Sequence, residues 1–156
     1  MPDAKDDEAT ARIEQYRLLI ADVYELAGLS RTTSEVIAND VGGQTVARWH
    51  VMSTVSQQQL TVPDIARRLG LARQSVQRVV DDLVASGHLE RRTNPAHRRS
   101  PLVELTRRGH ASLRRLNHAA AAARATQLAD VDVTLSDLVE ARTTIRALIA
   151  MLGDGG

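Results

Sequence analysis

Three residue types that can hydrogen-bond the edges of nucleic-acid bases occur together in the middle of the chain, as Arg73, Gln74, Ser75, Gln77 and Arg78. An Arg guanidinium can pair with guanine O6 and N7, a Gln amide with adenine N6 and N7, and a Ser hydroxyl with bases or phosphate. On a helix these residues would lie opposite a row of valines and leucines. The segment therefore predicts a helix whose N-terminal half enters the major groove, where its dipole also favours phosphate.

A second basic cluster follows, with no acidic residue between Glu90 and Glu104. It contains Arg91, Arg92, His97, Arg98 and Arg99. Arginines at the tip of a hairpin suit the minor groove, whose narrow stretches concentrate negative potential. Each of these residues, taken singly, fits an ordinary solvated surface as well. Their convergence favours DNA, with Arg73, Gln74, Ser75, Gln77, Arg78, Arg98 and Arg99 as the predicted contacts.

The charge distribution agrees with this interpretation, although the net charge is only +1. Residues 1–40 hold nine acidic and four basic side chains, whereas residues 60–110 hold ten arginines and five acids. A basic segment in a nearly neutral chain indicates a polyanionic partner.

The elements that must position these side chains form a helix-turn-helix followed by a hairpin. Thr61 and Asp64 make a capping box with Pro63 in the first turn, and Gly70 ends that helix. A second helix then runs to about Ser86 and closes at Gly87. Residues 88–92 and 102–105 read as short strands around an Asn-Pro turn at Asn94. A hairpin after a helix-turn-helix is a wing.

The flanking segments are helical by periodicity. We expect a helix from Ala9 to Ala27 stopped by Gly28, and a short second helix opened by Thr32 with Glu35 before the glycines at 42 and 43. Three more helices are expected, over 45–55, over 106–130, and after a capping box of Thr134 with Asp137. The fold class is mainly α with a small β-wing.

Composition excludes several other classes. There is no cysteine, which rules out disulfides and thiol chemistry, and the five histidines are scattered without metal-ligand spacing. Neither a signal peptide nor an apolar run of membrane-spanning length is present, so we expect a cytoplasmic protein with no membrane partner. No phosphate loop or nucleophile–base set indicates an enzyme or a cofactor.

Residues 45–116 resemble the multiple antibiotic resistance regulator (MarR) family, and the flanking helices match its order over nearly the whole chain. The wing carries the most specific motif. Family wings commonly read Asp-Pro-x-Asp-x-Arg before Leu-Val-x-Leu-Thr-x-x-Gly, and this chain has Asn94-Pro-Ala-His-Arg-Arg99, then Leu102-Val-Glu-Leu-Thr106 and Gly109. The resemblance places Arg99 on the family's minor-groove arginine. Asn94 and His97 replace the usual Asp, which suggests a looser or pH-sensitive wing.

The resemblance implies a homodimeric transcription regulator, a repressor, on a pseudo-palindromic stretch of double-stranded DNA. One domain would span 1–156, with residues 1–40 and 107–156 as dimerisation helices and residues 45–106 as the DNA-binding lobe. A small aromatic or anionic effector is implied as well. Residues proposed for its pocket, which combine rings with polar groups, are Tyr16, Tyr24, Arg48, Trp49 and His50. Taken singly, each residue fits the alternative better: the rings would be core residues and His50 an ordinary helix residue. The alternative function is a winged-helix module whose arginines meet an acidic protein.

Overall fold

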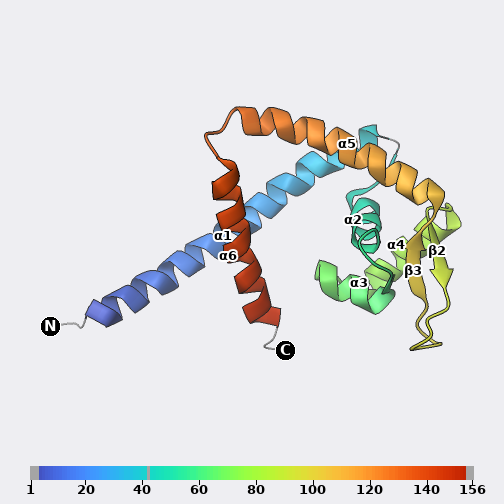
Figure 1. Ribbon diagram of the computed structural model, residues 1–156, viewed down its shortest axis with the longest axis horizontal. Helices are drawn as coiled ribbons and strands as arrows, with labels where there is room; N and C mark the ends of the chain where they lie inside the picture. Colours follow the sequence, from blue (N-terminus) through green and yellow to red (C-terminus); the bar gives the residue numbers. More distant parts are fainter. Residues whose placement is uncertain (1–3, 42, 154–156) are drawn as a thin grey trace. The chain divides into compact units, whose positions relative to one another are not determined.

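The computed structural model describes residues 4–41 and 43–153 as six helices and three short strands (Figure 1). They are α1 (Ala4–Asp40), α2 (Val46–Val55), β1 (Leu60–Thr61), α3 (Val62–Leu69), α4 (Arg73–Ala85), β2 (Leu89–Arg92), β3 (Leu102–Leu105), α5 (Arg107–Ala129) and α6 (Leu135–Gly153). The chain divides into two compact parts, Met1–Ala119 and Ala120–Gly156, with the boundary inside α5. This mainly helical chain with a small sheet confirms the predicted fold class.

The N-terminal helix differs from the prediction. Instead of a helix stopped at Gly28 and a second one opened by Thr32, α1 runs without interruption from Ala4 to Asp40. The Thr32 hydroxyl donates to the Gly28 carbonyl at 3.3 Å, so it does not cap a new helix. A glycine ends a helix when it adopts a left-handed conformation, and Gly28 does not: in the described chain positive φ occurs at Gly43, Gly70 and Gly87. Gly42 lies outside the described residues.

The helices of the winged lobe begin and end where local chemistry predicts. Thr45 caps α2 by accepting from the Arg48 backbone N–H, and Thr61 with Asp64 forms the predicted capping box of α3. Gly70, at φ 64°, ends α3 and lets the chain turn into α4. The core between these helices consists of side chains with almost no exposed surface: Val51, Met52, Ile65, Val76, Val80, Leu83, Leu89 and Val103.

A three-stranded antiparallel sheet in the order β1-β3-β2 forms the wing base. Strands β2 and β3 pair from Leu89 with Leu105 to Arg92 with Leu102, which confirms the predicted hairpin. Strand β1 was not predicted, because its two residues are too few to show a period. It pairs Leu60 with Val103 and thereby attaches the hairpin to the chain between α2 and α3.

The start of α5 is fixed against the first residues of the hairpin. The Thr106 hydroxyl donates to the Gly87 carbonyl at 2.7 Å and accepts from the Gly109 backbone N–H at 3.1 Å. A Cβ at Gly109 would lie 2.1 Å from the carbonyl oxygen of His88, closer than any real contact. The Leu-Thr-x-x-Gly sequence therefore lets α5 pass directly over the backbone at His88.

The second compact part contains the end of α5 and all of α6. The Thr134 hydroxyl accepts from the Asp137 backbone N–H, while the Asp137 carboxylate accepts from the Thr134 backbone N–H at 2.8 Å, as the capping box predicted. None of the residues of α6 is buried, although the helix is rich in Leu, Val and Ile. Across the described chain, no helix combines the length and the hydropathy needed to cross a membrane.

Candidate nucleic-acid interface

Helix α4 presents the predicted polar face. Arg73, Gln74, Ser75 and Arg78 are exposed and Gln77 is half-buried, while Val76, Val80 and Leu83 on the other side are buried. Ala72 at the N-cap makes no side-chain cap hydrogen bond. A helix N-terminus of this kind attracts phosphate groups.

Asp81 connects the face of α4 with the wing. Its Oδ1 accepts from Gln77 Nε2 at 2.9 Å and also forms an ion pair with Arg91 on β2. An acid late in α4 thus pairs with an arginine of the neighbouring strand. One carboxylate holds a residue of the predicted reading face next to the first arginine of the hairpin.

The wing loop is closed by Asn94, which is buried although it lies between the two strands. Its Nδ2 donates to the Ser100 carbonyl at 2.9 Å, and its Oδ1 accepts from the Ala96 backbone N–H at 3.1 Å. Asn is favoured at such turns because its side chain replaces a backbone partner. Arg98 and Arg99 are exposed on the loop that Asn94 closes. No pattern in the sequence predicts that this Asn spans the loop.

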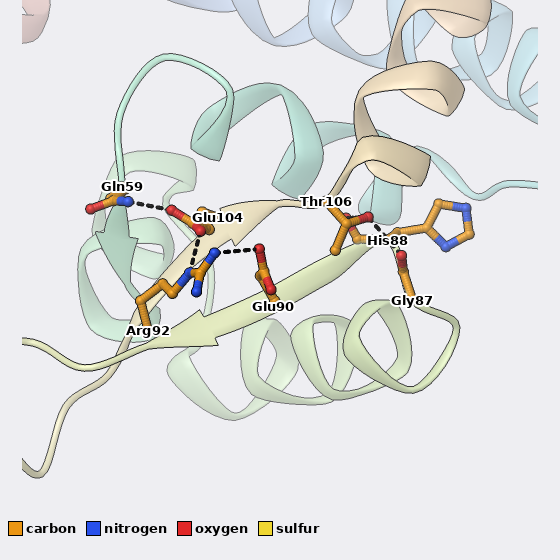
Figure 2. A network of polar contacts seen from close by, with 7 residues as sticks. All are labelled: Gln59, Gly87, His88, Glu90, Arg92, Glu104 and Thr106. Atoms are coloured by element: carbon orange, nitrogen blue, oxygen red, sulfur yellow. Dashed lines mark hydrogen bonds and ion pairs between the residues drawn. The ribbon is translucent and has the colours of Figure 1, made fainter.

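At the wing base, charged side chains hold the strands in register (Figure 2). Arg92 pairs with Glu104 across the hairpin and with Glu90 at 2.9 Å, and Gln59 donates to the same Glu104 carboxylate. The hydrogen bond from Arg92 lowers the pKa of Glu104, so this carboxylate stays ionised. Of the wing arginines, Arg91 and Arg92 therefore have structural partners, and Arg98 and Arg99 form no ion pair within the described chain.

The five residues predicted for an effector pocket differ in their surroundings. Tyr24 on α1 is 77% exposed and Tyr16 is 36% exposed. Trp49 is buried and its Nε1 donates to Asn117 Oδ1 at 3.1 Å. Arg48 donates to Ser86 Oγ at 2.8 Å. His50 lines a cavity of about 510 Å³ between α1, the start of α2 and Leu71.

Among residues 4–41 and 43–153, no group of His, Asp or Glu side chains has an arrangement that could hold a metal ion.

Comparisons with known proteins place the chain in a family. A sequence profile described as MarR family matches residues 43–100. The chain is also 47% identical over 134 residues to the uncharacterized protein Rv2011c of Mycobacterium tuberculosis, an alignment that covers 86% of this chain and 92% of the relative.

Solved structures agree in fold. The transcriptional regulator BldR from Sulfolobus solfataricus aligns with a TM-score of 0.77 at 20% identity, covering 88% of this chain and 98% of that one. Staphylococcus aureus MarR in complex with salicylate and kanamycin aligns with a TM-score of 0.70 at 13% identity, covering 98% of both chains. The wing motif, the helix-turn-helix and these similarities together show that the chain belongs to the MarR family and has the winged-helix fold of its transcription regulators.

Proposed function

We propose that the protein is a homodimeric, sequence-specific DNA-binding transcription regulator that acts as a repressor. The observation that carries the proposal is the link through Asp81, which joins Gln77 on the reading face of α4 to Arg91 at the start of the wing. A helix held in this way beside a hairpin can occupy a major groove while the hairpin tip reaches the adjacent minor groove.

The residues divide by role. Arg73, Gln74, Ser75, Gln77 and Arg78 would contact base edges and phosphates in the major groove. Arg98 and Arg99 would enter the minor groove, and Asn94 would keep their loop closed. Arg91 and Arg92 would position the wing, because their guanidinium groups are already paired with acids.

Pairing of two chains is supported by the exposed apolar residues of the flanking helices. On α1 these include Ile13, Leu26 and Leu29, and on α6 they include Leu135, Val139 and Leu152, each more than half exposed. Several large apolar side chains exposed on one helix are typical of a surface that another chain covers. We propose residues 1–40 and 107–156 as the dimerisation helices around a DNA-binding lobe of residues 45–106, so that two copies of α4 meet successive major grooves.

Salt dependence of DNA binding tests the proposal. Affinity for duplex DNA is measured by fluorescence anisotropy over a range of salt concentrations, for the wild type and for Arg98→Gln/Arg99→Gln, with Arg146→Gln on α6 as the matched control. Each lost phosphate contact should lower the slope of log affinity against log salt by roughly 0.9. Gln74→Ala should instead weaken discrimination between DNA sequences, by about 1–3 kcal/mol for a bidentate contact. Weak, salt-insensitive binding by the wild type would favour the alternative, a module that contacts acidic proteins.

Release by a small aromatic or anionic effector belongs to the same proposal. His50 lines the cavity between α1 and the start of α2, so His50→Ala is the variant to test. Salicylate, one of the two ligands named for the S. aureus structure, should raise the thermal unfolding temperature of the wild type and weaken its DNA binding. An equal response of His50→Ala would remove His50 from the proposal.

A further inference from the structure

The two glutamines on the polar face of α4 differ in what surrounds their amide groups. Gln74 is exposed, and within the described chain its amide forms no hydrogen bond. Gln77, about one turn further, is half-buried, and its Nε2 donates to Asp81 Oδ1 at 2.9 Å. Gln and Asp four residues apart on a helix commonly pair in this way. The protein therefore holds one of these two amides and leaves the other free to turn.

Asp81 is itself held by a second element of the lobe. The oxygen that accepts from Gln77, Oδ1, also forms an ion pair with Arg91 on β2. Both members of this ion pair are exposed, so it adds little to the stability of the fold. Its effect is local, because it keeps the carboxylate beside the Gln77 amide.

The chemistry of Asp81 decides which way round the Gln77 amide lies. A Gln amide has an acceptor, the carbonyl oxygen, and a donor, the NH2 group, and a free amide can present either one. An ionised carboxylate has no proton to give and only accepts hydrogen bonds. Gln77 must therefore turn its NH2 group toward Asp81, which leaves Oε1 on the other side of the amide.

The groups of Gln77 that remain available match one purine. Nε2 carries two hydrogens, and the bond to Asp81 uses one of them. An acceptor, Oε1, and one N–H donor remain side by side. In the major groove adenine presents a donor at N6 beside an acceptor at N7, whereas guanine presents two acceptors, O6 and N7. Adenine can form both hydrogen bonds, while guanine would set its O6 against Oε1 of Gln77.

We propose, resting on the proposed function, that Asp81 is a positioning residue that makes Gln77 select adenine over guanine at one position of each half-site. Gln77 contacts the base, and Asp81 acts through Gln77 by fixing the orientation of its amide. The orientation of Gln74 is set by the DNA that it meets and not by the protein. Helix α4 thus carries one fixed and one adjustable reading group, about one turn apart.

Selection of bound sequences from random duplex DNA by the full chain, followed by sequencing, tests the role of Asp81. The wild type should enrich adenine over guanine by about tenfold or more at one position of each half-site, as expected of a good bidentate pair. Gln77→Met replaces the amide by an apolar side chain of similar length. It should abolish the preference at that position alone and thereby identify it.

Three further variants separate the orientation of the amide from the ion pair with the wing. Asp81→Asn should lower the ratio of adenine to guanine at the Gln77 position by about tenfold, because an Asn amide can accept or donate and no longer requires the NH2 group of Gln77. Asp81→Glu keeps a carboxylate and should retain the preference. Arg91→Gln removes the ion pair but leaves the carboxylate, so it should retain the preference too. All three substitutions are at exposed positions, where the fold tolerates change.

The proposal is overturned if Asp81→Asn leaves the ratio unchanged, or if Gln77→Met alters the preference at no position. It is equally overturned if Arg91→Gln lowers the ratio as much as Asp81→Asn does, because the placement of the wing would then set the base. In each of these results the wild type still selects a sequence, so the proposed function stands. A wild type that enriches no sequence would contradict the proposed function and this role of Asp81 together.

Discussion

Apolar side chains are used in opposite ways by the winged lobe and by α6. In the lobe, Met52, Ile65 and Leu83 have no exposed surface, and they pack together from three different helices. On α6, Leu135 is 80% exposed and Leu152 is 62% exposed. The lobe therefore completes its core within one chain, whereas α6 presents an apolar surface that a second copy can cover.

The two regions should also differ in how their stability depends on protein concentration. The lobe should unfold with a free energy that is independent of concentration, because its contacts are intramolecular. Contacts made by α6 across a dimer would stabilise the chain by mass action, and their contribution would grow with protein concentration.

The largest expected effect comes from the lobe core. Leu83→Ala should lower the free energy of unfolding by about 3 kcal/mol, within the usual range of roughly 2–5 kcal/mol for a fully buried leucine. Urea denaturation monitored by circular dichroism measures the loss. The matched control is Leu138→Ala on α6, where the leucine is 44% exposed and the loss at low protein concentration should be under about 1 kcal/mol. Equal losses of unfolding free energy for the two variants would contradict the claim that the lobe has an intramolecular core and α6 does not.

Substitution on α6 should act on association instead. Leu135→Ser/Ile149→Ser should raise the dimer dissociation constant by about 100-fold or more, because burying each such side chain contributes about 1.5–3 kcal/mol. Sedimentation velocity over a dilution series measures the constant. Leu71→Ser, an exposed leucine in the lobe, is the control and should leave association unchanged. A wild-type chain that sediments as a monomer at micromolar concentration would contradict the proposed dimer.

Helix ends predicted from local chemistry supply a third, smaller comparison. Thr61→Ala removes a cap that accepts from the Asp64 backbone N–H, and it should cost about 1 kcal/mol of unfolding free energy. Thr61→Ser keeps a hydroxyl at the same position and should recover most of that loss. Chemical denaturation of the two variants decides whether the cap acts as described, and equal losses would show that the threonine methyl group matters instead.

These caps also show what the sequence could predict. Thr61 with Asp64, Thr134 with Asp137, and the glycines at 70 and 87 act within a few residues, so their consequences were readable before any tertiary structure. The predicted helix end at Gly28 was wrong. A glycine inside a helix lowers its stability by only about 1 kcal/mol relative to alanine, so the helix can continue through it. Strand β1 depends on pairing with β3, and no local sequence pattern predicts such a long-range contact.

In the candidate site, too, local features were predicted and features that depend on tertiary contacts were not. The exposed polar face of α4 and the arginines of the wing loop were predicted from spacing. The roles of Asn94 and Gly109 were not, because each depends on a backbone group that folding brings close: Ser100 for Asn94 and His88 for Gly109. A cavity of about 760 Å³ is likewise lined by Gln44 and Arg115, which are far apart in sequence.

The smallest effect concerns pH. The pKa of His88 is lowered from its ordinary value of 6.5, mainly by burial. Between the folded and the unfolded pKa values the unfolded chain binds more protons, so the free energy of unfolding should fall as pH drops through about 6.5. His88→Gln should flatten the pH dependence between pH 7.5 and 5.5. Because burial also lowers the pKa of His50, His50→Gln should flatten it in the same direction. An unchanged profile in His88→Gln would contradict the assignment.

The most direct test of the whole account is a hydroxyl-radical footprint on DNA selected from random sequence by the wild-type protein. Two copies of α4 and two wings predict protection in two half-sites centred about one helical turn apart, roughly 34–36 Å. Arg98→Gln/Arg99→Gln should remove the outer, minor-groove protections and leave the central ones. A single protected stretch, or a footprint that the wing variant leaves unchanged, would contradict the claim that α4 and the wing of a dimer engage DNA together.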